Sequence, residues 1–178
     1  VSYIGANGGL VLAAADDPGL HSSQNEQDSR CVARVAQVPV LEPSDSQEAK
    51  DFTKLAFEYS EKYDTPVMIR TTTRLAHSQG PVTLEERQEI PDKPYERNAA
   101  KHVMMPANAK GRHVHVENRL KQMAEDACGF EINKAVYKDT SVGFITSGIP
   151  YTYVAEAMPN ASVLKLGLVH PLPRKLIE

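Results

Sequence analysis

Cysteine is scarce in this 178-residue chain, which contains only Cys31 and Cys128. The two residues lie far apart in the sequence, and neither belongs to a Cys-x-x-Cys pair. Disulfide frameworks and iron–sulfur clusters each need several cysteines, so neither can be built from this chain alone. A reducing, cytoplasmic compartment is therefore the default expectation.

Long apolar runs and clustered basic residues are also missing. The longest apolar stretch, residues 8–15, is far shorter than the roughly 20 residues of a membrane-spanning helix. Twenty Lys and Arg residues stand against 23 Asp and Glu residues, for a formal net charge of −3, and no basic stripe occurs. Because phosphate binding depends on clustered positive charge, we expect neither nucleic acid nor a membrane as partner.

The amino-terminal residues VSYIGANGG are typical of a helix end closed by glycine, and the first residue is Val1 rather than methionine. We therefore expect the chain to be part of a longer protein. Gly5, Gly8 and Gly9 come before the first predicted strand, whereas the glycines of a nucleotide-binding loop follow a strand. The helix-terminating interpretation is favoured for them.

An alternation of strand and helix patterns begins after these glycines. Residues 10–15 are uniformly apolar, which predicts a strand buried on both faces, as in a parallel sheet covered by helices. Ser23 and Glu26 have the spacing of a capping box, which predicts a helix over residues 24–36.

The same alternation continues to about residue 70. Residues 38–41 and 67–70 form short apolar runs that predict a second and a third strand. Between them, Ser44 and Asp45 offer caps for a long helix with apolar residues at helical spacing. Strand, helix, strand, helix, strand is an α/β pattern with right-handed crossovers, so the predicted fold class is α/β.

The character of the sequence changes over residues 79–110, where four prolines are spread through a charged, weakly periodic segment. We expect a linker arm without regular structure. Its later part, which contains Val103, Met104 and Met105, is too apolar for a free tether and should pack against the rest of the protein. A helix closed by Gly129 should follow, because apolar residues between 116 and 127 share one face.

A second α/β unit is predicted from about residue 141. Residues 142–146 are predicted to form a strand, and Ser147 and Gly148 a turn. A helix is predicted over residues 151–158 and another strand over residues 162–169. The chain ends where a further helix would begin.

The segment after the first predicted strand is the leading candidate for a functional site, because open α/β sheets bind ligands at the carboxyl ends of their strands. Within thirteen residues it contains an imidazole, two hydroxyls, three carboxamides and several carboxylates. The candidate residues are His21, Ser22, Ser23, Gln24, Asn25, Glu26 and Asp28. A solvated loop in which Ser23 and Glu26 only cap a helix is the alternative, and the two interpretations are compatible.

Two further polar segments contain residue types that could form a site. Arg70 and Arg74 flank three threonines at the end of the third strand, where they could hold an anion or simply pair locally. His113 and His115 alternate as in an exposed strand and lack a third ligand, so no metal site is predicted there.

Several stretches together resemble the α subunits of indolepyruvate ferredoxin oxidoreductases, a family of thiamine-diphosphate-dependent 2-oxoacid oxidoreductases. They are ADDPGLHSSQNEQDSR, LEPSDSQEAKDF, IRTTTRLAHS, YERNAAKHVMMPA, VGFITSGIPYTYVAEAMP and VLKLGLVHPLPRKLI, and they span essentially the whole chain. The first is long and chemically unusual, which makes it the most specific of the set.

The resemblance implies oxidative decarboxylation of aryl 2-oxoacids such as indolepyruvate to aryl-acetyl-CoA, with electrons passed to ferredoxin. It implies thiamine diphosphate with Mg²⁺ and 4Fe–4S clusters in the complete enzyme, a β subunit as partner and an oligomeric assembly. It makes residues 1–78 part of a pyrimidine-binding domain, residues 79–140 a linker arm with one helix, and residues 141–178 the start of a transketolase carboxyl-terminal-like domain.

On that resemblance His21 and Ser22 are the candidate catalytic residues. Ser23, Gln24, Asn25, Glu26, Asp28, Arg70 and Arg74 are the candidates for binding substrate or cofactor. The metal and cluster ligands would lie outside this chain, which would be inactive alone. A non-catalytic α/β interaction module and a small-anion-binding domain built on Arg70, Arg74 and the Ser22–Ser23 segment are the alternatives.

Overall fold

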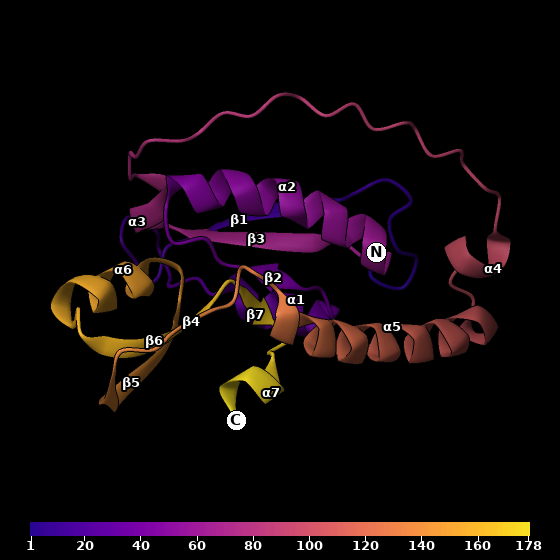
Figure 1. Cartoon of the computed structure of the whole chain (residues 1–178). Helices are drawn as coiled ribbons and strands as arrows, with labels where there is room; N and C mark the ends of the chain where they lie inside the picture. Colours follow the sequence, from indigo (N-terminus) through magenta and orange to yellow (C-terminus); the bar gives the residue numbers. More distant parts are fainter.

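The computed structural model describes all residues, 1–178, as a mixed α/β structure (Figure 1). The helices are α1 (Ser29–Ala36), α2 (Ser46–Tyr63), α3 (Thr73–Ala76), α4 (Ala99–His102), α5 (Pro106–Asp126), η1 (Ala127–Gly129), α6 (Gly148–Ala157) and α7 (Arg174–Ile177). The strands are β1 (Val11–Asp16), β2 (Val40–Leu41), β3 (Val67–Thr72), β4 (Lys134–Val136), β5 (Asp139–Ser147), β6 (Ala161–Leu166) and β7 (Leu168–His170). No helix is long and apolar enough to cross a membrane.

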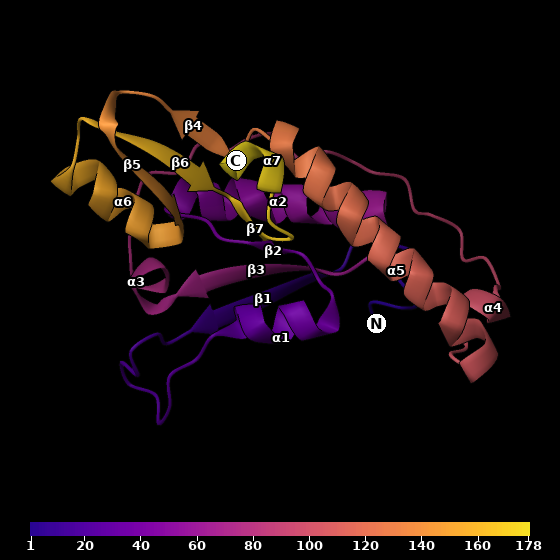
Figure 2. The same ribbon diagram turned by 90° about the horizontal axis from the view of Figure 1, so that it is seen from below.

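The larger sheet has the strand order β1-β3-β2-β7. β1 and β2 both pair in parallel with the central strand β3, as the α/β pattern predicts, whereas β7 pairs antiparallel with β2. Because β1, β2 and β3 run the same way, their carboxyl ends meet at one edge of the sheet (Figure 2). That edge is where α/β sheets bind ligands.

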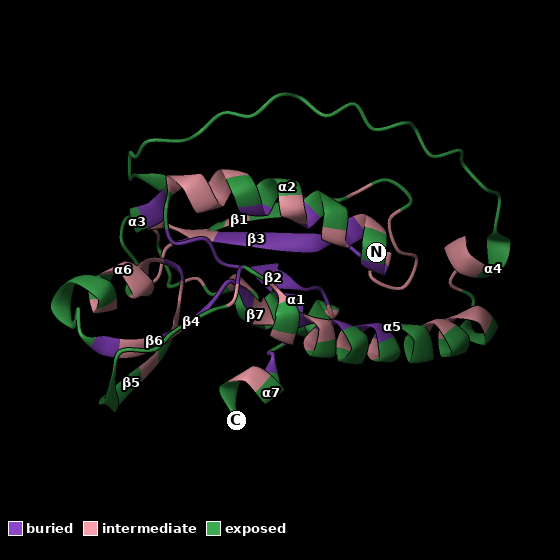
Figure 3. Cartoon of the chain, viewed as in Figure 1, coloured by how far each residue is buried: buried purple, intermediate pink, exposed green.

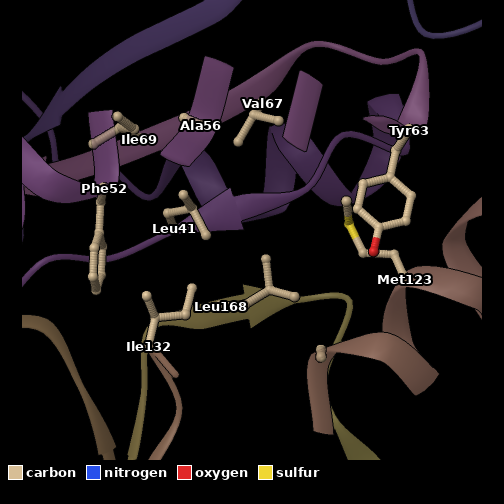
Figure 4. Close-up of a cluster of buried hydrophobic side chains, with 10 residues drawn as sticks. Leu41, Phe52, Ala56, Tyr63, Val67, Ile69, Met123, Ile132 and Leu168 are labelled. Carbon is tan, nitrogen blue, oxygen red and sulfur yellow. The ribbon is translucent and has the colours of Figure 1, made fainter. Parts of the chain in front are cut away.

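Helices cover both faces of this sheet. Side chains of a strand alternate between faces. Val67 and Ile69 of β3 accordingly pack in one cluster with Phe52 and Ala56 of α2, while Met68 packs in another with Ala33 of α1. The first cluster is the main core and also takes in residues of β2, β7 and α5 (Figure 4). A fully buried side chain of this kind stabilises the fold by about 1.5–3 kcal/mol.

A smaller sheet of order β4-β6-β5 carries the later part of the chain. β5 and β6 pair in parallel, with α6 between them along the chain, and β4 pairs antiparallel with β6. The chain then returns to the larger sheet through β7. The division at residues 78 and 140 stays a prediction, and β7 adds its three residues to the sheet of the first 78.

Two local signals in the first part of the chain are confirmed. Gly5 ends a single helical turn, with φ of +78° and a hydrogen bond of 2.9 Å from its amide to the Val1 carbonyl. Asp45 caps α2, because its side chain accepts a hydrogen bond of 2.8 Å from the Glu48 amide.

The predicted helix start at residue 24 is wrong. Ser23 and Glu26 do not form a capping box, and α1 begins only at Ser29, with Asp28 as its N-cap. Ser29 is held instead by Asp16 at the end of β1, which accepts hydrogen bonds from its amide at 2.8 Å and its hydroxyl at 2.5 Å. This tertiary contact adds to the local cap by Asp28 and takes the place of the predicted Ser23–Glu26 box.

The predicted burial of the first strand is also wrong, since β1 lies at the edge of the sheet. Leu12 is 40% exposed, and Asp16 is the only fully buried residue of the strand. An edge strand pairs on one side only, and therefore fewer neighbours cover it than cover the central β3, which is buried over four residues (Figure 3).

The arm is regular over part of its predicted length. Residues 79–98 contain no helix or strand and are exposed (Figure 3), but α4 lies within the predicted irregular segment and α5 begins inside it, with Pro106 as its first residue. Proline fits there because the first helical amide has no intrahelical partner. The expected apolar docking is found only in part, since Met104 is half-buried whereas Val103 is 49% and Met105 60% exposed.

The last two elements differ in their bounds from the prediction. α6 begins at Gly148 rather than at residue 151, and the single strand predicted over 162–169 is two strands, β6 and β7, separated by Gly167. A Cβ at Gly167 would lie 2.6 Å from the Ile132 carbonyl oxygen, so the chain bends where only glycine fits.

Candidate functional site

A pocket of about 340 Å³ opens at the carboxyl edge of the parallel strands. This edge pocket lies between the ends of β2 and β3, the loop after β1 and the amino-terminal end of α6. Its lining residues are Pro18, His21, Arg30, Glu42, Pro43, Arg70, Thr72, Arg74, Ser147, Gly148, Ile149, Pro150 and Tyr153. The two predicted α/β units therefore share this pocket.

A buried group of three charges lies at the base of the edge pocket. Arg70 donates a hydrogen bond through Nε to Asp16 and through Nη1 to Glu42 at 2.8 Å. All three side chains are at most 5% exposed. Burial opposes ionisation of Asp16, but hydrogen bonds from Ser29 and the Arg70 guanidinium outweigh it and hold the pKa of Asp16 below its ordinary value.

Glu42 also connects the first sheet to the later part of the chain. Its other carboxylate oxygen accepts a hydrogen bond of 2.6 Å from the Ser147 hydroxyl, which precedes α6. Gly148 follows with φ of +54°, and a Cβ there would lie 3.6 Å from the same Glu42 oxygen. Glu42 thus bridges Arg70 and Ser147, residues from β3 and the end of β5.

The loop after β1 is tied to the same edge by Asp17. Its carboxylate accepts hydrogen bonds from the Ser23 and Thr73 hydroxyls, and these two bonds hold the pKa of Asp17 below its ordinary value. Gln27 closes the loop by accepting a hydrogen bond of 3.3 Å from the Asp17 amide. The loop between the strand and α1 therefore has a fixed connection to α3 through Thr73.

The candidate residues of this loop fall into two groups. His21 lines the edge pocket, with a positive φ of +40°. The Ser23 hydroxyl is already engaged, because it donates a hydrogen bond to the Asp17 carboxylate. The remaining members do not line the pocket and are exposed; these are Ser22, Gln24, Asn25, Glu26 and Asp28. Asp28 caps α1 and pairs with Arg30 at 2.8 Å.

The two candidate arginines differ in their freedom to bind a ligand. Arg70 lines the pocket but is buried between two carboxylates. Arg74 is exposed at the pocket rim, forms no ion pair and lies over the Tyr153 ring, with 6.0 Å between its guanidinium carbon and the ring centroid. Arg74 is therefore the arginine that can meet an anion, beside an aromatic surface.

His113 and His115 lie on α5 and not on a strand, because residues 106–126 are helical throughout. His113 accepts or donates a hydrogen bond of 2.7 Å with the Tyr3 hydroxyl. No group of three or more His, Cys, Asp and Glu side chains is arranged to hold a metal ion.

Sequence reasoning missed Asp16, Glu42, Ser147 and Tyr153 as members of this edge. Asp16 and Glu42 each follow an apolar strand directly, and a carboxylate at that position was the available signal. Ser147 and Tyr153 had no such signal, because they reach the edge only through the pairing of β7 with β2 and the packing of α6.

The arrangement suits a small anionic ligand with an organic body. Arg74 and His21 offer polar contacts at the rim, Tyr153, Ile149 and Pro150 offer apolar surface, and the buried charges beneath are satisfied by one another. Such a pocket can orient a carboxylate and shield the atoms next to it from water.

Comparison with protein families gives one match. Residues 12–142 match the thiamine-diphosphate-binding domain of pyruvate flavodoxin/ferredoxin oxidoreductase. The matched residues include eight of the thirteen residues that line the edge pocket, from Pro18 in the loop after β1 to Arg74 in α3.

Individual proteins match over nearly the whole chain. Indolepyruvate oxidoreductase subunit IorA of Archaeoglobus fulgidus is 42% identical over 99% of this chain, and that of Pyrococcus abyssi is 43% identical over 100%. This chain spans 29% of the length of each. The 2-oxoglutarate synthase subunit KorA of Methanocaldococcus jannaschii is 35% identical over 80% of this chain and 49% of its own length.

Proposed function

The chain belongs to the pyruvate flavodoxin/ferredoxin oxidoreductase family, and on this premise we propose that it is part of an enzyme that oxidatively decarboxylates aryl 2-oxoacids. The 2-oxoacid and CoA would react to give an aryl-acetyl-CoA, CO2 and two electrons, which pass to ferredoxin. Relatives that share about two residues in five are named for indolepyruvate, which supports an aryl substrate over 2-oxoglutarate.

The edge pocket is the part of this chain that we assign to the substrate. Arg74 binds the carboxylate of the 2-oxoacid, because it is the exposed cation of the rim that is not in an ion pair. Tyr153 and Ile149 contact the aryl group, and stacking on Tyr153 orients it. His21 lies beside the reacting carbonyl, where a donor acts most strongly as negative charge develops.

The loop from His21 to Asp28 stays the proposed substrate-facing segment of the matched domain. Ser22, Gln24, Asn25 and Glu26 are exposed and free of the contacts that hold the loop, apart from a 3.3 Å hydrogen bond from Asn25 to the Glu26 carbonyl. Their polar groups are available to substrate or cofactor. Ser23 and Asp28 hold the loop in place through Asp17 and Arg30.

The residues of this chain fit one part of thiamine diphosphate. A polar pocket of about 340 Å³ at the carboxyl edge of a parallel sheet suits a heteroaromatic ring and a small 2-oxoacid. No side-chain group here is arranged to hold Mg²⁺, so we assign the metal and the diphosphate to other parts of the complete enzyme. When bound, thiamine diphosphate supplies the electron sink for decarboxylation.

The protein's own contribution is to position the bound 2-oxoacid and to exclude water from it. The Asp16–Arg70–Glu42 group fixes the floor of the pocket, and Ser147 holds the start of α6 against it. A rigid floor keeps Arg74 and Tyr153 at a constant separation, which favours one orientation of the bound acid. In the proposed cytoplasmic oligomer this chain assembles with a β subunit and with 4Fe–4S clusters, and CoA and ferredoxin are the acyl and electron acceptors.

The proposal is tested on the complete enzyme that contains this chain, assembled with its partner subunit. Reduction of ferredoxin or a viologen dye is measured with thiamine diphosphate, Mg²⁺ and CoA, using indolepyruvate, phenylpyruvate, pyruvate and 2-oxoglutarate in turn. We expect the aryl acids to have the highest kcat/KM. A preference for pyruvate or 2-oxoglutarate would contradict the substrate assignment, and turnover without thiamine diphosphate would contradict the reaction. The 178-residue chain alone should show no turnover.

A further inference from the structure

A second and larger hollow lies on another side of α1. This basic cleft has a volume of about 720 Å³ and is bounded by α1, α5 and the segment from β7 to α7. Its lining residues are Arg30, Arg34, Glu117, Leu120, Lys121, Ala124, Glu125, Val169, His170, Pro171, Leu172, Arg174 and Lys175. The cleft plays no part in the substrate assignment above.

Positive charge dominates the lining of the basic cleft. Five of its residues are Lys or Arg and two are Glu, although the whole chain has a net charge of −3. Arg30 is paired with Asp28, but the four cations Arg34, Lys121, Arg174 and Lys175 take part in no ion pair and donate no side-chain hydrogen bond. They come from three separate helices, α1, α5 and α7. Four unpaired cations around one hollow favour a ligand with more than one negative charge.

Much of the remaining lining of the basic cleft is apolar. Leu120 and Ala124 of α5 face the cleft together with Val169 and Leu172, of which Leu172 is 47% exposed. The Nε2 atom of His170 is buried and has no hydrogen-bond partner. An apolar wall suits the organic part of a ligand.

We propose that the basic cleft binds an organic polyphosphate of the nucleoside-diphosphate class. The phosphates contact Arg34, Lys121, Arg174 and Lys175, and the organic part lies on the apolar wall. The volume of the cleft lies within the range of sites for small organic ligands, about 300–1,000 Å³. Arg30 lines both the cleft and the edge pocket, so the ligand would be separated from the substrate by one side chain.

Calorimetric titration of the complete enzyme with ADP, with adenosine and with inorganic pyrophosphate tests the proposal. ADP should bind more tightly than either of its parts, and its affinity should fall as salt is raised. The double variant Arg34→Ala, Lys121→Ala should weaken ADP binding by about tenfold or more. The matched control Arg97→Ala, Lys110→Ala removes the same charge from exposed positions outside the cleft and should leave the affinity unchanged.

Four results would overturn the proposal. No ADP binding at low ionic strength would mean that the cleft is not a polyphosphate site, for example because another segment of protein covers it. Equal weakening by the two double variants would mean that only the overall charge matters. If adenosine bound as tightly as ADP, the four cations would not contribute to binding. If pyrophosphate bound as tightly as ADP, the apolar wall would not contribute to binding. Circular dichroism of each variant verifies that it has folded.

Discussion

Replacing Arg70 by methionine removes the one cation between Asp16 and Glu42. Methionine keeps most of the side-chain length, so the main change is the loss of charge. The two carboxylates are 3% and 5% exposed and would remain buried, with Ser29 as the partner of Asp16 and with Ser147 and the half-exposed Arg30, 3.7 Å away, as the partners of Glu42. Removing one partner of a buried ion pair costs about 3–5 kcal/mol of unfolding free energy. In a protein of this size that loss lowers Tm by roughly 6–20 °C.

The loss should also depend on pH in a defined direction. In the wild type the lowered pKa of Asp16 means that its contribution is present above the ordinary value of 3.8 and disappears as pH falls through the folded-state pKa. In Arg70→Met the buried Asp16 lacks its cation, which raises the pKa of Asp16, so it takes up a proton at a higher pH. The difference in Tm between the two proteins should therefore be largest near neutral pH and shrink toward pH 4.

Thermal unfolding followed by circular dichroism at several pH values measures this effect. Arg87→Met is the matched control, because Arg87 pairs with Glu89 in the exposed arm, with side chains 85% and 81% exposed. Exposed pairs contribute little, so the control should unfold like the wild type. The reasoning would be refuted if Arg70→Met were no less stable than Arg87→Met, or if its deficit did not change with pH.

Three further outcomes follow from the contacts described. Ser147→Ala should lower the unfolding free energy by about 1–3 kcal/mol in urea titration, because the buried Glu42 oxygen loses its 2.6 Å donor; an unchanged midpoint would contradict this bond. Burial and the nearby Arg34 lower the pKa of His170 below 6.5, so wild-type Tm should fall as pH drops below that value, and His170→Gln should show a smaller fall. Trypsin should cut first within residues 84–97, which are exposed and irregular, and first cuts within α5 would show that this helix is not firmly packed.

Local signals predicted the centre of the fold well. α2 was predictable because Asp45 caps it within the chain and its apolar residues recur at helical spacing, which does not depend on distant contacts. β3 was predictable because it is buried over four consecutive residues. The parallel pairing of β1, β2 and β3 then follows from the strand–helix alternation.

Two of the failures share one physical cause, which is the influence of distant residues. α1 starts at Ser29 because Asp16, thirteen residues earlier, binds its amide and hydroxyl more effectively than the local box at Ser23 and Glu26. β1 has an exposed side because the strand order places it at the edge, which no periodicity reveals. The irregular arm is shorter than predicted for a local reason. Proline usually breaks a helix, but Pro106 is the first residue of α5, where proline is favoured.

The location of the candidate site could be predicted from the sequence better than the residues that form it. The carboxyl edge, His21 and Arg74 follow from the rule for α/β sheets. Arg70 could be located but not its burial, because Glu42 and Asp16 become its partners only when three strands align. Ser147 lies 105 residues from Glu42 in the sequence, so their contact could come only from the folded chain.

The central claim is that the edge pocket and the exposed loop beside it bind the 2-oxoacid, through His21 and Arg74 of the pocket and Ser22 of the loop. The most direct measurement is kcat/KM for indolepyruvate in the complete enzyme carrying His21→Ala, Ser22→Ala or Arg74→Gln, with His113→Ala on α5 as the matched control. The account predicts a decrease of about tenfold or more, or roughly 1.4 kcal/mol, for the three site variants. It predicts an unchanged Tm for them and an unchanged rate for the control. Full activity in His21→Ala and Arg74→Gln, or a loss no greater than that of His113→Ala, would contradict it.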